Sequence, residues 1–371
     1  MPTSLAAAFL LSLAAPEPVD VFESRGCDPA SAYDNFRIPA VAVARSGAIL
    51  AFAEGRHADS DQSGNDLVLR RSLDGGRTWE PLRVIAHADA ATLNNPQVVV
   101  LQPPHREGRV LLVHQRYEAG VGEYSKVEGK ALPLTKSFVT TSDDEGLTWT
   151  PSVDVTEAVT PAGSVTVASG PGRAIQLQRG PRAGRILQPM NRREEKAWSV
   201  YAAFSDDGGS TWNYGGLAPA ETDGFPNEVQ MVELVDGAVM LNCRLQGGKA
   251  RSRGVAVSRD GGATWSPVQA DPRLVDPVCM GSIIRLREPG PADCGVLAFS
   301  NPAKRDARAG GMIRFSLDDG RTWCREIRIG AEQDFFAYSA LVRLDDRRVG
   351  CLYEAKGECA VIRFGVIDVA W

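Results

Sequence analysis

Apolar and polar positions along the chain form many short runs that are broken by clusters of glycine, aspartate and serine. Runs such as Leu67–Arg71, Phe138–Thr141 and Val255–Val257 are rich in β-branched residues and lead directly into such clusters. This pattern is typical of short strands joined by tight turns. The 37 glycines agree with many turns, so the pattern favours an all-β fold over a helical one.

An eight-residue pattern, Ser-x-Asp-x-Gly-x-Thr-Trp, recurs five times and gives the strongest sign of organisation. The starts of successive copies are separated by 70, 63, 53 and 58 residues. Each copy follows a short apolar run, so each marks one unit of about four strands, and the spacing suits one propeller blade with its loops. The copies are Ser72–Trp79, Ser142–Trp149, Ser205–Trp212, Ser258–Trp265 and Ser316–Trp323.

The residue types of the repeat predict a stapled β-hairpin. An aspartate side chain accepts hydrogen bonds from backbone N–H groups of a turn, and glycine adopts the positive φ that other residues resist. Threonine favours the next strand, and tryptophan supplies a large apolar anchor. The repeats are therefore elements of the fold, and fold alone does not fix function.

The regions on either side of the repeats contain further apolar runs, which predict a sixth unit. We expect strands from both flanks to close a ring and so to remove exposed sheet edges. The fold prediction is an all-β, six-bladed β-propeller that forms a single domain over residues 20–371. The flanking runs are Ile38–Val43, Ala48–Ala53, Leu352–Glu354 and Val361–Val369.

The net charge of −5 excludes several classes of partner. No basic run points to nucleic acid or to an anionic membrane surface, so an anion-binding site must be a local cluster. Residues 1–15 include an apolar run, Leu5–Ala15, of the length found in secretory signals, although no Lys or Arg precedes it. We expect a signal peptide and a secreted or periplasmic protein, with a cytoplasmic location as the alternative. No later segment is long and apolar enough to cross a bilayer.

The seven cysteines show no CxxC spacing, and their number is odd. This gives no support to a zinc site, and we interpret them as buried free thiols. They are Cys27, Cys243, Cys279, Cys294, Cys324, Cys351 and Cys359.

Phe36-Arg37-Ile38-Pro39, just before the first propeller strand, resembles the FRIP motif of exo-α-sialidases (neuraminidases), and the five repeats resemble their Asp boxes. The resemblance extends from about Phe36 to Phe364. A guanidinium offers a planar fork for a carboxylate, and sialic acid carries one on its anomeric carbon. By resemblance, Arg37, Arg244 at the end of the run MLNCR, and Arg308 would bind that carboxylate. Arg305 and Arg314 are alternatives to Arg308.

The segment LAFAEGR, which ends at Arg56, resembles a sialidase strand that precedes the acid/base aspartate by five residues. That position is Asp61. Spacing alone does not separate Asp61 from Asp59, and Asp66 is a third carboxylate of the same loop. The resemblance also implies that Arg56 contacts sugar hydroxyls.

Three further residues complete the resemblance. Tyr338 in FAYSAL would be the nucleophile, Glu228 in NEVQ would activate it, and Glu354 in LYE would fix the Arg37 side chain. Glu233, five positions after Glu228, falls on the opposite face of a continuous strand. Gly170–Leu177 looks like a substrate-side loop of the family, without an assigned role.

The resemblance implies retaining hydrolysis of terminal sialic acid from glycoproteins, glycolipids or oligosaccharides, by a monomer that needs no metal or other cofactor. A neutral tyrosine nucleophile avoids repulsion from the carboxylate of the substrate. Alternatives are a trans-sialidase, a hydrolase of a related nonulosonic acid, and a non-catalytic sialic-acid-binding propeller. The non-catalytic propeller would lack the acid or the nucleophile.

Overall fold

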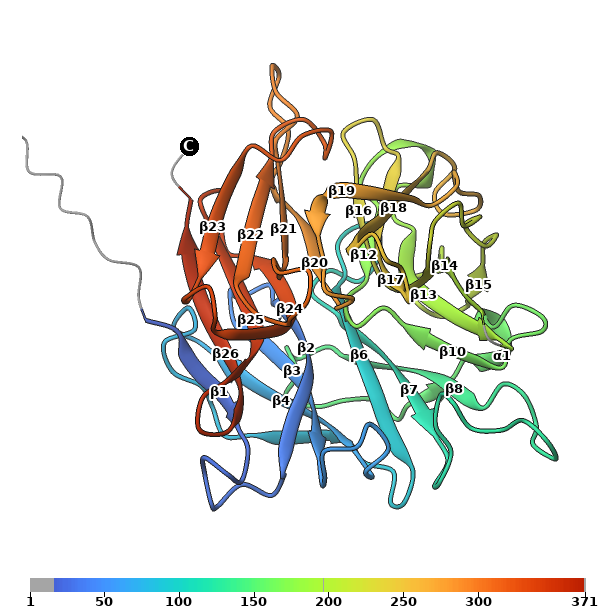
Figure 1. Cartoon of the computed structure of the whole chain (residues 1–371), viewed down its shortest axis with the longest axis vertical. Coiled ribbons are helices and arrows are strands. Elements are labelled where there is room, and N and C mark those ends of the chain that lie inside the picture. The colour runs from blue at the N-terminus through green and yellow to red at the C-terminus, as the bar shows by residue number, and fades with distance from the viewer. Residues whose placement is uncertain (1–16, 196, 370–371) are drawn as a thin grey trace, which may run out of the picture.

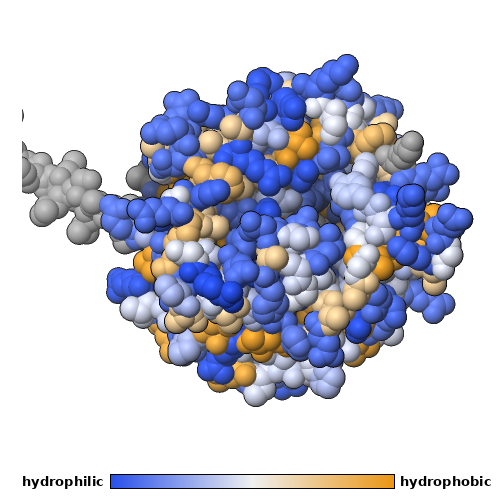
Figure 2. Space-filling view, turned by 60° about the horizontal axis from the view of Figure 1, so that its bottom comes forward, coloured by the Kyte–Doolittle hydropathy of each residue, from blue (hydrophilic) through white to orange (hydrophobic). Residues whose placement is uncertain are grey.

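The computed structural model describes residues 17–195 and 197–369 and shows a six-bladed β-propeller (Figure 1). Six sheets stand around a central axis, and the colour of the chain runs around the ring from blue to red. The predicted fold class is confirmed. The face turned forward in Figure 2 is mostly hydrophilic and is hollowed near its centre.

Each blade is built on four antiparallel strands, of which the first lies next to the axis and the others follow outwards. The first blade contains β2 (Asn35–Val43), β3 (Ile49–Arg56), β4 (Asp66–Ser72) and β5 (Arg83–Ala86). The second contains β6 (Thr92–Val100), β7 (Val110–Tyr117), β8 (Thr135–Ser142) and β9 (Val153–Asp154). The third contains β10 (Thr166–Ser169), β12 (Ile175–Gln176), β13 (Ile186–Glu194), β14 (Ala197–Ser205) and β15 (Asn213–Tyr214).

The remaining blades repeat this plan. The fourth contains β16 (Phe225–Glu233), β17 (Val239–Gln246), β18 (Ser252–Ser258) and β19 (Gln269–Val275). The fifth contains β20 (Ser282–Arg287), β21 (Val296–Pro302), β22 (Gly311–Ser316) and β23 (Arg325–Ile329). The sixth contains β24 (Phe335–Arg343), β25 (Arg348–Lys356), β26 (Ala360–Asp368) and β1 (Val19–Glu23). The short strand β11 (Gly172–Arg173) adds to the second blade as a parallel neighbour of β6. The helix α1 (Thr156–Val159) and a 3-10 turn (Gly180–Arg182) lie outside the sheets.

The sixth blade joins the two ends of the described chain, but not with the early strands that we expected. β1 is its outermost strand and pairs with β26, with Val19 opposite Phe364. The early runs at 38–43 and 48–53 instead form β2 and β3 of the first blade. The repeats mark five of the six blades. Because each repeat lies between the third and fourth strands of its blade, the two strands before the first repeat belong to the first blade.

Cys27 and Cys359 form a disulfide in this closing blade, so the interpretation of all seven cysteines as free thiols is wrong for this pair. It links the loop after β1 to the β25–β26 hairpin. The two cysteines are 332 residues apart in sequence, and only closure of the ring brings them together. Cys243, Cys279 and Cys351 are buried free thiols, whereas Cys324 is exposed.

The five repeats form the predicted stapled turns between the third and fourth strands of their blades. In the second blade, Asp144 accepts hydrogen bonds from the backbone N–H of Thr148 (2.8 Å) and from the Ser142 hydroxyl (2.8 Å). The turns of the repeats also pack against the preceding blade. A Cβ at Gly209, where φ is 93°, would lie 2.4 Å from Leu111 of the preceding blade. Glycine is therefore required there by conformation and by packing.

An Asp144→Asn variant is expected to lower the melting temperature at neutral pH by about 2–4 °C. Although partial burial opposes it, hydrogen bonds from Thr148 and Ser142 lower the pKa of Asp144 from 3.8 to about 2. A carboxylate with a lowered folded-state pKa contributes stability above its unfolded pKa and loses it as the pH falls through the folded value. Melting curves between neutral pH and pH ~2 should therefore show the deficit shrinking below pH ~4. The exposed Asp306→Asn variant is the control, and a deficit that is independent of pH would contradict the prediction.

Among the described residues, no helix is long and apolar enough to span a membrane. The expected signal peptide, residues 1–15, lies outside the described residues.

Candidate active site

The innermost strands of four blades carry a β-bulge near the end at which they approach the same side of the ring. A bulge bends a strand and redirects its side chains, and such bulges are frequent beside active sites. Here they aim residues from four blades at the axis. The bulges lie between Arg37 and Ala40, between Asn94 and Gln97, between Pro226 and Val229, and between Phe336 and Ser339.

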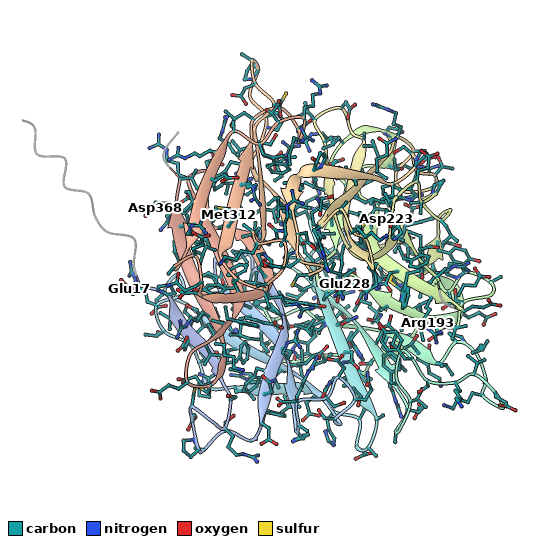
Figure 3. All side chains as sticks on the ribbon, in the orientation of Figure 1. Glu17, Arg193, Asp223, Glu228, Met312 and Asp368 are labelled. Carbon is teal, nitrogen blue, oxygen red and sulfur yellow. A yellow bond between two sulfur atoms is a disulfide. The ribbon has the colours of Figure 1, made fainter. Side chains whose placement is uncertain are left out.

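The bulged strands surround a cavity of about 210 Å³ on the axis. Figure 3 places the labelled Glu228 near the centre of the ring, whereas Met312 and Asp368 lie well away from it. None of the five repeats contributes a residue to the cavity wall. Seven of the eight predicted site residues line it: Arg37, Arg56, Asp61, Glu228, Arg244, Arg308 and Tyr338.

Tyr338 and Glu228, from β24 and β16, form a hydrogen bond in which the tyrosine hydroxyl donates to Glu228 Oε1. Arg244 from β17 contacts both groups, because its Nη1 lies 2.8 Å from Glu228 Oε2 and 3.2 Å from the tyrosine hydroxyl. Burial and the nearby negative charge of Glu228 raise the pKa of Tyr338 well above its usual value. The phenol is therefore protonated at rest, and the Glu228 carboxylate is the acceptor of its proton in this hydrogen bond.

Arg37 and Arg308 also approach this tyrosine, at its ring. Their guanidinium carbons are 5.3 and 5.4 Å from the centre of the Tyr338 ring. Arg308 donates no hydrogen bond to any residue of the described ranges, which leaves its guanidinium available to a ligand. The two alternatives lie elsewhere, since Arg305 binds the Ala250 carbonyl and Arg314 pairs with Glu326.

Glu354, with a side chain only 4% exposed, forms an ion pair with Arg37. Its Oε1 accepts hydrogen bonds from Arg37 Nε (2.7 Å) and from the backbone N–H of Ile38 (2.9 Å). The attraction of Glu354 raises the pKa of Arg37. Ile38 has a φ of 60°, which is strained for a β-branched residue. The bulge leaves the backbone N–H of Ile38 without a partner in the sheet, and Glu354 accepts a hydrogen bond from it.

Asp61 is the one carboxylate of its loop that lines the cavity. Its side chain is 65% exposed and accepts a hydrogen bond from Arg56 Nη1 at 2.6 Å. Asp59 binds Asn35, whereas Asp66 is buried against Tyr33 and His87. The geometry therefore separates the two candidates that spacing left open.

Arg56 is almost completely buried and pairs with Glu54 as well as with Asp61. The structure thus shows Arg56 holding the aspartate in place, and contact with a sugar hydroxyl stays a prediction. Glu54 was missed by the sequence analysis, although Glu54 and Arg56 share a face of β3. Its Oε1 accepts the backbone N–H of Asn95 (2.7 Å), a residue at the next bulge with a φ of 54°.

The rim of the cavity carries residues that the sequence analysis also missed. Glu123 and Tyr124, from the loop between β7 and β8, line it. Trp198 donates a hydrogen bond to Glu123 Oε1 (2.8 Å), and its ring lies 6.0 Å from those of Tyr124 and Phe225. Burial raises the pKa of Glu123. No sequence motif marks these residues, because a loop and two blades bring them together.

The arrangement combines three arginines, a phenol that is hydrogen-bonded to a carboxylate, and a separate exposed carboxylate. Three guanidinium groups suit a carboxylate ligand, and the other groups suit nucleophilic catalysis with an acid/base partner. Within residues 17–195 and 197–369, no group of three or more His, Cys, Asp or Glu side chains has the arrangement to hold a metal ion.

These features define a propeller of the BNR-repeat class, and residues 47–351 match the family described as BNR repeat-like domain. The chain is 33% identical to a sialidase of Micromonospora viridifaciens over 96% of this chain and 55% of that protein. It is 30% identical to an exo-alpha-sialidase of Arthroderma benhamiae, over 87% of this chain and 78% of that protein. A solved structure, Hadza microbial sialidase Hz136, superposes with a TM-score of 0.78 at 26% identity and covers 91% of this chain and 66% of that one.

The chain belongs to the sialidase family. It spans little more than half the length of the first relatives, with 55% of the Micromonospora protein and 60% of a sialidase of Bacteroides fragilis.

Proposed function

We propose that this protein is an exo-α-sialidase that removes terminal sialic acid from glycans with retention of anomeric configuration. The observation that carries the proposal is the hydrogen bond between the Tyr338 hydroxyl and Glu228, set between three arginines. The curated names of its relatives support the substrate class.

In the proposed reaction, Arg37, Arg244 and Arg308 bind the substrate carboxylate and orient the anomeric carbon towards Tyr338. The tyrosine oxygen bonds to that carbon as its proton passes to Glu228, and the bond to the leaving oxygen breaks while Asp61 protonates it. Asp61 then takes a proton from water, which displaces the tyrosine, and Glu228 returns the proton to the phenol. The product keeps the configuration of the substrate after two displacements.

Replacing Asp61 is expected to affect poor leaving groups far more than good ones. Asp61→Ala should lower kcat/KM for a sialyl-lactose by about 10²–10⁴-fold, the usual contribution of general acid catalysis. An aryl sialoside with an acidic phenol needs little protonation to depart, so its first step should lose much less. Asp59→Ala, in the same loop but outside the cavity, is the matched control and should retain wild-type rates on both substrates. Equal losses for the two substrates, or a larger loss in the Asp59 variant, would refute the role of Asp61.

We also propose that the protein reaches an oxidising compartment, since disulfides persist mainly there. The Cys27–Cys359 disulfide supports this location. Alkylation of the denatured protein from its native host should label five cysteines before reduction and all seven after it. Seven labels before reduction would place the native protein in a reducing compartment. Reduction should also lower its stability, by about 2–5 kcal/mol for a native disulfide.

A further inference from the structure

The axial channel of the propeller holds a second cavity at the end opposite to the candidate active site. Its volume is about 440 Å³, and the second halves of the innermost strands line it. Glu233 illustrates the division, because it lies here while Glu228 of the same strand faces the active site. Five arginines and three glutamates line this second cavity, so its wall carries an excess of positive charge.

A short segment, residues 170–173, lies across the channel between the two cavities. The chain leaves the third blade after β10, pairs with β6 through β11, and returns as β12. Gly170 packs so closely that a Cβ there would lie 1.7 Å from the Val229 carbonyl oxygen. Two buried glutamines hold the segment, with Gln97 donating to the Gly170 carbonyl (2.6 Å) and Gln230 to that of Pro171 (2.8 Å).

The segment therefore presents its arginine, Arg173, to the second cavity. This corrects the expectation that Gly170–Leu177 is a substrate-side loop, because Arg173 and Ile175 line the far cavity and not the active site. No residue of Gly170–Leu177 lines the active-site cavity, whereas Ala168, on the preceding strand β10, does. The backbone at Gly170 packs directly against Val229 and leaves no room for a side chain. This close contact holds the segment that places Arg173 at the second cavity.

Arg173 is the unpaired cation of this cavity. Within the described ranges, its guanidinium has no hydrogen bond or ion pair, whereas the other lining arginines each pair with a carboxylate. Burial lowers the pKa of Arg173, the positive charge of Arg343 adds to this effect, and Glu288 opposes it. Arg173 is only partly exposed to solvent. A guanidinium that is largely removed from water and has no partner is costly, and a bound anion would compensate it.

We propose that the second cavity binds a small oxyanion, such as phosphate or a short dicarboxylate, between Arg173 and Arg343. The planar fork of a guanidinium matches two oxygens of either ligand, and the excess of arginines supplies the remaining attraction. Such an anion would connect the crossing segment with the sixth blade, which carries Arg343 on β24. The site is separate from the proposed sialidase activity and does not depend on it.

The test is the melting temperature of the protein in phosphate, malonate or chloride at equal ionic strength. Phosphate or malonate at about ten times its Kd should raise the wild-type value by about 2 °C over chloride. The stronger of the two identifies the kind of oxyanion. Arg173→Gln should abolish this rise in melting temperature. Arg173→Lys, which keeps the charge but loses the planar fork, should reduce it. The Lys variant provides the test if the Gln variant does not fold.

The active-site arginines are the competing location for the same anions, so Arg308→Gln is the matched control. The proposal expects this variant to keep the rise that Arg173→Gln loses. It is overturned by the reverse pattern, by an equal rise in the Arg173 variants and the wild type, or by a wild type that oxyanions stabilise no more than chloride does.

Discussion

A Tyr338→Phe variant is expected to lose turnover of a fluorogenic α-sialoside by about 10³-fold or more, because it removes the nucleophile but none of the binding groups. Tyr338 is 6% exposed, and its hydroxyl contacts only Glu228 and Arg244 within the described ranges. Phenylalanine keeps the ring that Arg37 and Arg308 approach, so the fold and the affinity for free sialic acid should change little. The measurements are steady-state kinetics and calorimetric binding.

The pairing of Tyr338 with Glu228 makes this prediction sharper. Glu228→Gln should also be nearly inactive, and the double variant should be little worse than either single variant, because the two residues act as one unit. Tyr353→Phe, a buried tyrosine on the neighbouring strand outside the cavity, is the matched control and should keep wild-type turnover. Losses that multiply in the double variant, or near-normal rates in Tyr338→Phe, would refute the assignment.

Most of the fold could be predicted from the sequence because its key elements are local. Each repeat carries its own turn, hydrogen bonds and tryptophan within eight residues, so five copies reveal five blades. The pairing of Val19 with Phe364 and the Cys27–Cys359 disulfide could not be read in this way, because both join chain ends that only a closed ring brings together. The same limit explains the assignment of the early strands to the wrong blade.

The sequence named the candidate site residues one by one, but it did not reveal the framework that supports them. The arginines and Tyr338 were found by resemblance, and the structure gathers them in one cavity. The bulges that aim them leave no sequence signal, since Ile38 and Asn95 adopt positive φ without being glycine. Each is supported by a buried carboxylate, Glu354 for Ile38 and Glu54 for Asn95. The protein thus repeats one device in two blades, in which a glutamate satisfies a strained bulge and also holds an arginine.

Glu354 offers the sharpest test of that device. Glu354→Ala is expected to raise KM by about 10–100-fold, because Arg37 loses the partner that orients it towards the substrate carboxylate. The buried N–H of Ile38 also loses its acceptor, so the free energy of unfolding should fall by about 2–4 kcal/mol. Glu354→Gln keeps an oxygen for that N–H and should recover most of the stability, but less of the affinity. The measurements are kinetics at a temperature where all variants are folded, and chemical denaturation.

The matched control is Glu233→Ala, at the opposite end of the channel. Like Glu354, Glu233 is buried and accepts hydrogen bonds from the backbone and from an arginine side chain. The donors are the backbone N–H groups of Gln178 and Arg179 and the guanidinium of Arg179. Its loss should therefore destabilise the propeller by a comparable amount and leave KM and kcat unchanged. If KM rises equally in the Glu233 and Glu354 variants, the effect is a general loosening of the ring. If KM rises in Glu354→Ala alone, the carboxylate acts through Arg37. The single buried charge of Glu354 then both stabilises the bulge at Ile38 and orients the arginine that binds substrate.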